Sequence, residues 1–156
     1  MQIEFLKKWI GILVFKVSSV EIGYDITRLH ILSHIKYTLI SEGLLEYEGM
    51  KIPIFPLGDF FNIKNNPKNK DKSILIFESK TGNIGFVIDE IEEILPLDNI
   101  SLEKEFRFEK EASNNYIFGK LLFEGRIILI LDFDKIAAYV METKKEIIKS
   151  SVIAEY

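Results

Sequence analysis

Short segments in which apolar residues alternate with polar or small ones occur along most of the chain. Residues 12–17 and 20–26 form the first two, with Ser18-Ser19 between them as a turn. Since successive side chains of a strand point to opposite faces, this alternation predicts half-buried strands. Similar segments occur at residues 29–37, 44–47, 51–55, 74–77, 84–91, 94–97, 117–123 and 127–133. The chain is therefore predicted to be mainly β.

Turns, connections and one helix are predicted between and after these strands. Glycine-containing segments at residues 48–50 and 124–125 predict hairpin turns. Residues 64–72 contain no large apolar side chain and predict a loop between two halves of the chain. Residues 103–115 are dense in charge and predict a long surface connection. Apolar residues return at helical spacing over residues 135–149, which predicts a C-terminal helix.

The two halves of the chain repeat one another in sequence order. The matched segments are residues 22–26 with 84–88, residues 43–49 with 119–125, and Ile52 and Ile54 with Ile128 and Ile130. We interpret the repeat as two small β lobes, the first over about residues 12–63 and the second over about 74–134. Because each lobe alone would be marginally stable, the two are expected to share a hydrophobic seam. The alternative is a chance likeness between two Ile-rich hairpins.

Composition excludes several classes of function. The 156 residues are 47% hydrophobic and 28% charged, which is typical of a globular domain rather than a disordered chain. The absence of cysteine excludes disulfides and thiol chemistry, and the net charge of −4 gives no overall basic field for nucleic acid or anionic lipid. No apolar stretch approaches the roughly 20 residues of a membrane-spanning helix. We expect a cytoplasmic protein without direct membrane insertion.

Few residues are candidates for catalysis or metal binding. His30 and His34 have the i, i+4 spacing of helical zinc ligands, but they lie in a predicted strand and are expected to be surface histidines. Asp132 and Asp134 precede the predicted helix and are expected to cap it. We therefore expect no catalytic residues, no metal and no cofactor.

Nucleic-acid binding and protein binding remain as alternatives. Small β barrels can bind single strands through aromatic platforms and basic grooves. The basic cluster of this chain, residues 64–72, is interrupted by Asn and Asp and contains no aromatic residue, so nucleic-acid binding is the less favoured alternative. A small acidic β protein with sheet edges and abundant apolar residues is better suited to binding other proteins.

Four motifs, taken in order, resemble those of the CheW-like family of chemotaxis coupling proteins. They are Glu21-Ile22-Gly23-Tyr24-Asp25-Ile26, the Gly43 to Ile54 segment with Gly49 and Pro53, Gly85-Phe86-Val87-Ile88-Asp89-Glu90-Ile91, and the Gly119 to Asp132 segment followed by Lys135-Ile136. The resemblance covers about residues 12–140. It implies two SH3-like five-stranded β-barrel lobes that share a hydrophobic core, with short helices and a C-terminal helix.

The resemblance also implies a function and its partners. Members of the family are non-enzymatic adaptors that connect the cytoplasmic tips of chemoreceptors to the regulatory domain of a chemotaxis histidine kinase. Carried over by position, the protein-binding residues would be Leu29, Ile31, Glu46, Glu48, Val87 and Asp89. Plain core packing is an equally open interpretation of Leu29, Ile31 and Val87.

One departure from the family pattern bears on partner choice. Glu48 stands where the family usually carries Arg, which reverses the charge at a position implied in coupling. Such a reversal at an interface can cost several kcal/mol with the standard partner. A different or co-varied partner is therefore expected.

Overall fold

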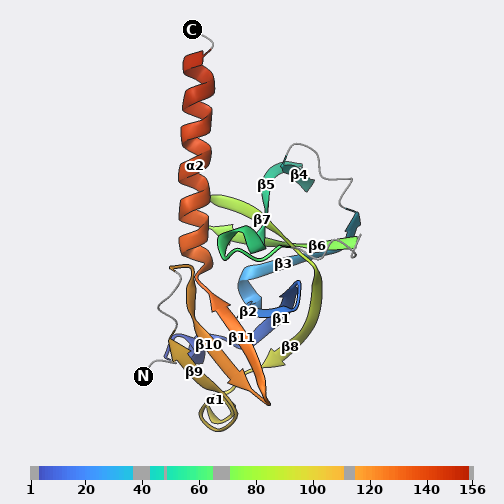
Figure 1. Cartoon of the computed structure of the whole chain (residues 1–156), viewed down its shortest axis with the longest axis vertical. Helices are drawn as coiled ribbons and strands as arrows, with labels where there is room; N and C mark the ends of the chain where they lie inside the picture. The colour runs from blue at the N-terminus through green and yellow to red at the C-terminus, as the bar shows by residue number, and fades with distance from the viewer. Residues whose placement is uncertain (1–3, 37–42, 48, 65–70, 111–114, 155–156) are drawn as a thin grey trace.

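The computed structural model describes residues 4–36, 43–47, 49–64, 71–110 and 115–154, so Glu48 lies outside the described residues. Two sheets form the body, and a long helix, α2 (Phe133–Ala154), extends away from it (Figure 1). Shorter helical segments are η1 (Leu6–Lys8), η2 (Ile26–Arg28), η4 (Leu57–Phe60) and α1 (Asn99–Glu105). The predicted mainly β class is confirmed. The predicted C-terminal helix is also present, and it begins and ends outside the predicted bounds of residues 135–149.

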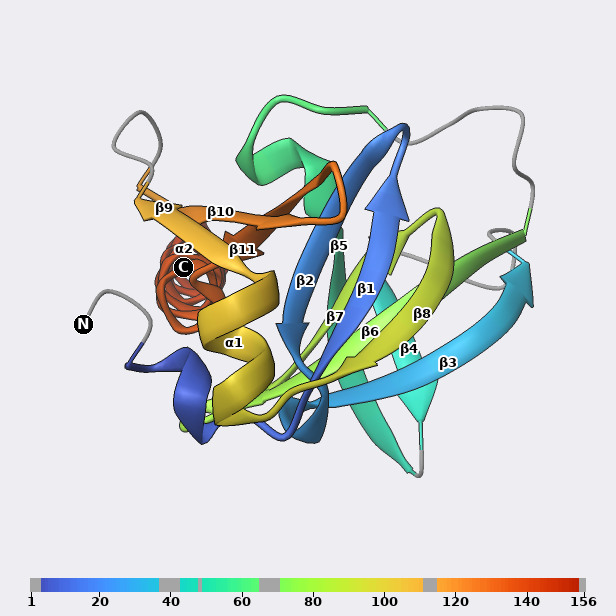
Figure 2. The same cartoon turned by 90° about the horizontal axis from the view of Figure 1, so that it is seen from below.

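The first sheet has six strands and the second has five, and both are curled (Figure 2). In spatial order the first contains β8 (Glu90–Pro96), β1 (Gly11–Val17), β2 (Val20–Asp25), β11 (Arg126–Leu131), β10 (Ile117–Phe123) and β9 (Arg107–Lys110). The second contains β3 (Leu29–Lys36), β6 (Asp71–Ser79), β7 (Gly82–Ile88), β5 (Met50–Pro56) and β4 (Leu44–Tyr47). One sheet therefore exceeds the predicted five strands.

The sequence repeat is visible in the strand order. Five strands of the first sheet, β8-β1-β2-β11-β10, correspond one by one to β3-β6-β7-β5-β4 of the second. In each sheet an antiparallel pair joins a hairpin through one parallel contact, β2 with β11 and β7 with β5. The segments matched in sequence occupy corresponding strands.

The sheets nevertheless combine strands from both halves of the chain. The pair β1–β2 joins β8, β10 and β11 of the second half, whereas β6–β7 joins β3, β4 and β5 of the first half. The lobes thus exchange strands, in contrast to the predicted sequential lobes of residues 12–63 and 74–134. The exchange has a local origin, since β3 and β8 each leave the sheet of the strand before them and pair in the other sheet.

Two glycines occupy equivalent places in the repeat for a shared steric reason. Gly23 of β2 lies opposite Ile130 of β11, and Gly85 of β7 lies opposite Ile54 of β5. A Cβ at Gly23 would lie 2.9 Å from Ile128 Cγ2 of β11, and one at Gly85 would lie 2.6 Å from Ile54 Cγ2 of β5. These separations are too short for carbon atoms, so only glycine allows the parallel contacts to pack in this way.

The buried apolar side chains of the described residues form three hydrophobic clusters. One occupies the curl of the first sheet and another, around Val87, occupies the curl of the second. The third lies between the sheets and is covered by the start of α2. This central cluster is the hydrophobic core that the lobes were predicted to share.

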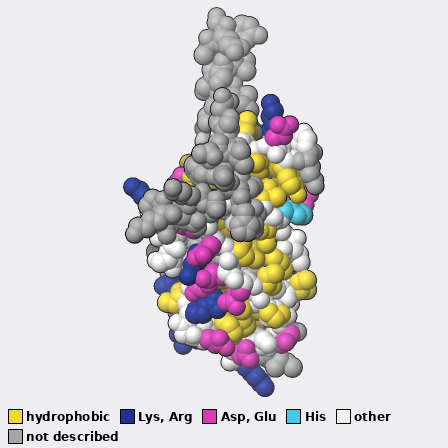
Figure 3. Space-filling view, turned by 90° about the vertical axis from the view of Figure 1, so that its right-hand side faces the viewer, with side chains coloured by type: hydrophobic (Ala, Val, Ile, Leu, Met, Phe, Trp, Pro, Cys, Tyr) yellow, Lys and Arg dark blue, Asp and Glu magenta, His cyan; other side chains and the backbone are white. Residues whose placement is uncertain are grey.

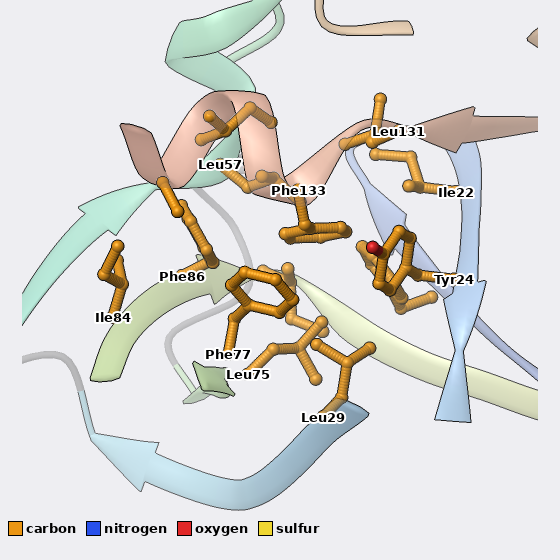
Figure 4. Close-up of a cluster of buried hydrophobic side chains, with 14 of the residues drawn as sticks. Ile22, Tyr24, Leu29, Leu57, Leu75, Phe77, Ile84, Phe86, Leu131 and Phe133 are labelled. Carbon is orange, nitrogen blue, oxygen red and sulfur yellow. The ribbon is translucent and has the colours of Figure 1, made fainter. Parts of the chain in front are cut away.

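Phe133, the first residue of α2, is at the centre of that shared core (Figure 4). Its ring centroid lies 4.5 Å from that of Tyr24 in the first sheet, and 5.5 Å and 5.3 Å from those of Phe77 and Phe86 in the second. The Asp132 carboxylate accepts a hydrogen bond from the Lys135 backbone N–H at 3.1 Å, as expected for a helix cap. The cap and the ring together fix where the helix leaves the body.

The predicted surface connection over residues 103–115 is instead partly structured. It contains the end of α1, and β9 follows directly. Asp98 caps α1 by accepting from the Ser101 N–H at 2.7 Å, and Phe106 is buried and stacks on Phe123 with ring centroids 4.4 Å apart. The high density of charge did not predict β9 as a strand, because β9 is an edge strand and most of its side chains are exposed.

Candidate protein-binding surface

Two of the predicted binding residues lie on the surface of the second sheet. Ile31 on β3 is 36% exposed, and the Glu46 side chain on β4 is exposed. These strands form opposite edges of the sheet, but its curl directs Leu32 of β3 and Leu45 of β4 onto one interior cluster with Val87. Ile31 and Glu46 therefore belong to the outside of a single curled lobe.

Two other predicted residues are core residues. Leu29 is 7% exposed and packs in the shared core, and Val87 is 2% exposed inside the second sheet. For both, the core-packing interpretation describes the structure. Glu48 lies outside the described residues.

Asp89 is buried where the chain passes from one sheet to the other. It lies between β7 and β8 and is 4% exposed. One carboxylate oxygen accepts from Lys72 Nζ of β6 at 2.6 Å, and the other accepts from the backbone N–H of Ser18 in the β1–β2 turn. Its own N–H donates to the Lys16 carbonyl at 2.9 Å. The residue therefore connects the two sheets.

The edge strand β8 carries an ionic network that the sequence did not indicate. Lys16 Nζ lies 2.8 Å from Glu92, and Arg126 donates to Glu21 at 2.6 Å and also to Glu93. The hydrogen bond from Arg126 lowers the pKa of Glu21. The hydrogen bond that Lys16 donates to Glu92 raises the pKa of Lys16.

Charged side chains along an edge strand discourage pairing with other strands, so this edge is protected against indiscriminate association.

Exposed hydrophobic side chains occur beside the network. Figure 3 shows them gathered on the face that carries β3 and β8, next to a mixed group of acidic and basic side chains. Ile94 of β8 is 56% exposed and Ile127 of β11 is 55% exposed. Neither was predicted as a binding residue. Apolar area bordered by charge is typical of surfaces that bind proteins.

Two absences among the described residues concern metal sites and membrane-spanning helices. Among them, no three His, Cys, Asp or Glu side chains are grouped as a metal site. His30 lies on strand β3 and is exposed, as predicted. Within the described part of the chain, no helix combines the length and the apolar character needed to cross a membrane.

Comparisons of the sequence and of the structure with known proteins both find CheW proteins. A family model described as a CheW-like domain matches residues 7–140. A chemotaxis protein CheW from Thermotoga maritima is 28% identical over 95 residues, a match that spans 61% of this chain and 61% of that relative. The crystal structure of the scaffolding protein TtCheW from Thermoanaerobacter tengcongensis superimposes with a TM-score of 0.62 at 25% identity, covering 78% of this chain and 88% of the other. This likeness confirms the predicted SH3-like two-lobed fold class.

Proposed function

The chain belongs to the CheW-like domain family, and from that premise we propose that it is a non-enzymatic, cytoplasmic adaptor of chemotaxis signalling. Its partners would be the regulatory domain of a chemotaxis histidine kinase and the cytoplasmic tip of a chemoreceptor. The observation that carries the proposal is the family match over residues 7–140. The two-lobed fold adds support, because each lobe has its own sheet edges and can hold a separate partner.

One contact area would lie on the second sheet. Ile31 offers apolar area on the edge strand β3, and Glu46 offers a negative charge on the outside of β4. Glu48 would add to that charge and select the partner. Leu29, Val87 and Asp89 would act indirectly, by holding the strands that carry the contact residues, because their own side chains are buried.

A binding assay tests the coupling role. The purified chain would be presented with the kinase regulatory domain and the receptor tip from the same cell, and we expect it to bind both. Ile31→Asp should weaken binding to at least one partner, whereas His30→Asp, an exposed neighbour on the same strand, is the matched control. Binding to neither partner would contradict the proposal.

A second assay concerns the charge at residue 48. If the natural partner has co-varied, Glu48→Arg should strengthen binding to a kinase or receptor of the usual type and weaken binding to the natural one. An unchanged affinity for both would argue against a divergent partner.

The nucleic-acid alternative is separated from the adaptor by salt dependence. Lys72, in the predicted basic loop, is buried in an ion pair with Asp89, which leaves one cation fewer for phosphate contacts. Retention on single-stranded DNA or RNA that falls steeply with salt would favour the alternative. We expect no such retention.

A further inference from the structure

Four aromatic rings and one carboxylate line a groove at the base of α2. The groove has a volume of about 300 Å³ and is lined by Phe55, Asp59, Phe60, Tyr116 and Tyr139. These residues come from β5, η4, the segment before β10, and α2. Figure 1 shows the segment after β5 beside α2. None of the described residues that line the groove is Lys or Arg.

Three of the four rings, those of Phe60, Tyr116 and Tyr139, are arranged around one another rather than in a stack. The centroid of Phe60 lies 5.8 Å from that of Tyr116 and 6.4 Å from that of Tyr139, with the planes nearly perpendicular in both pairs. The two tyrosine centroids are 6.2 Å apart. Tyr139 is 54% exposed, so a ligand can reach the groove from solvent. Ring faces carry negative potential and attract cations.

At another place in the molecule, a similar set of aromatic rings and a carboxylate binds an arginine side chain. The Arg28 guanidinium lies 4.6 Å from the centroid of Phe77 and donates to the Tyr24 hydroxyl at 3.3 Å. It also binds both carboxylate oxygens of Asp134, at 2.9 and 3.0 Å. A phenylalanine, a tyrosine and an aspartate thus hold one arginine. The groove presents the same three residue types, and Asp59 forms no ion pair with any described residue.

We propose that this groove binds an arginine side chain presented by a partner protein. The guanidinium would lie against the rings of Tyr139 and Phe60 and pair with the Asp59 carboxylate. Arginine fits better than lysine because its planar group stacks on rings and pairs with a carboxylate through two hydrogen bonds. A purely apolar occupant would bury Asp59 without a partner, which is unfavourable. The inference does not rest on the adaptor role.

A titration followed by NMR tests the site on the full chain. The probe is N-acetyl-arginine amide, compared with its neutral isostere N-acetyl-citrulline amide and with N-acetyl-lysine amide. We expect saturable shifts confined to resonances around Asp59, Tyr116 and Tyr139. Arginine should bind roughly three- to tenfold more tightly than citrulline, the range expected for cation–π and exposed ion-pair contacts.

Two pairs of variants assign the contacts. Asp59→Asn should weaken arginine binding roughly three- to tenfold and leave citrulline binding unchanged. Tyr139→Leu should weaken arginine binding, whereas Tyr139→Phe, which keeps the ring, should not. A far-ultraviolet spectrum and an unfolding midpoint for each variant separate lost binding from lost folding.

Three results would overturn the inference. Equal binding of arginine and citrulline would show that charge is not recognised. Shifts spread over other acidic surfaces that disappear with salt would show non-specific attraction. Concentration-dependent shifts at these residues without any probe would show that a second copy of the chain occupies the groove.

Discussion

Lys72 and Asp89 form a buried ion pair that joins β6 of the five-stranded sheet to the point where the chain crosses into the six-stranded sheet. The ammonium nitrogen lies 2.6 Å from the carboxylate oxygen, and the two side chains are 8% and 4% exposed. Because Asp89 also accepts from Ser18 in the β1–β2 turn, the pair fixes one sheet against the other.

Removing the cation of this pair should be strongly destabilising. Lys72→Met leaves the Asp89 carboxylate buried without the Lys72 ammonium, and we expect a loss of about 3–5 kcal/mol in the free energy of unfolding, measured with urea. Arg107→Met is the control, because its ion pair with Glu109 is exposed and should contribute less than about 1 kcal/mol. Equal effects of the two substitutions would contradict this role for Lys72.

Truncating the Phe133 ring, which packs between the two sheets, should destabilise the protein. Phe133→Ala removes a buried side chain that contacts Tyr24, Phe77 and Phe86, so we expect a loss of about 3–5 kcal/mol in the free energy of unfolding. Phe118→Ala, at a ring that is 38% exposed, should cost about 1 kcal/mol or less. A small effect at Phe133 would mean that the helix start is not part of the core.

Adding a methyl group at the repeated glycine should be unfavourable in both sheets. Gly23→Ala and Gly85→Ala would place a Cβ against β-branched isoleucines that cannot easily move, at an expected cost of about 1–3 kcal/mol each. The control is Asn83→Ala, on the same strand as Gly85 but half-buried, which should change the thermal unfolding midpoint little. Tolerance of both alanines would show that the parallel contacts are less tightly packed.

The pair between Glu21 and Arg126 should make stability depend on acid pH. The pKa of Glu21 is lowered in the folded state by the hydrogen bond from Arg126, so the unfolded chain binds a proton more readily. The stabilisation, about 1 kcal/mol, is complete above the ordinary glutamate pKa of about 4.3 and is lost as pH falls through the lower folded value. Glu21→Gln should therefore differ most from the unchanged protein near neutral pH. A difference that stays constant on acidification would show that the charge of Glu21 is not responsible.

Several elements of the fold could be predicted because they depend on neighbours in sequence. Alternation over residues 20–26 predicted β2, and glycine at position 125 predicted a hairpin turn, where Glu124 and Gly125 both adopt positive φ. The repeat was visible because matched strands, such as those with Gly23 and Gly85, meet the same packing demands. The family resemblance rested on the same local motifs.

The candidate surface was less predictable, because burial depends on what covers a strand. Leu29 and Ile31 share one face by alternation, yet Leu29 is buried in the shared core whereas Ile31 is exposed further along β3. The groove at Asp59 and Tyr139 joins residues 80 positions apart, and no spacing pattern marks it.

The sequence by itself thus determined the strand content, the turns and the existence of two matching units, since these follow from local side-chain periodicity and turn chemistry. Only the tertiary structure decided which strands of each half of the chain belong to which sheet. The parallel contacts of β2 with β11 and of β7 with β5 join distant segments, and they depend on close packing such as that of the Ile54 side chain against the backbone of Gly85. That exchange, together with the Phe133 ring and the Lys72–Asp89 pair, makes two repeated units into one protein.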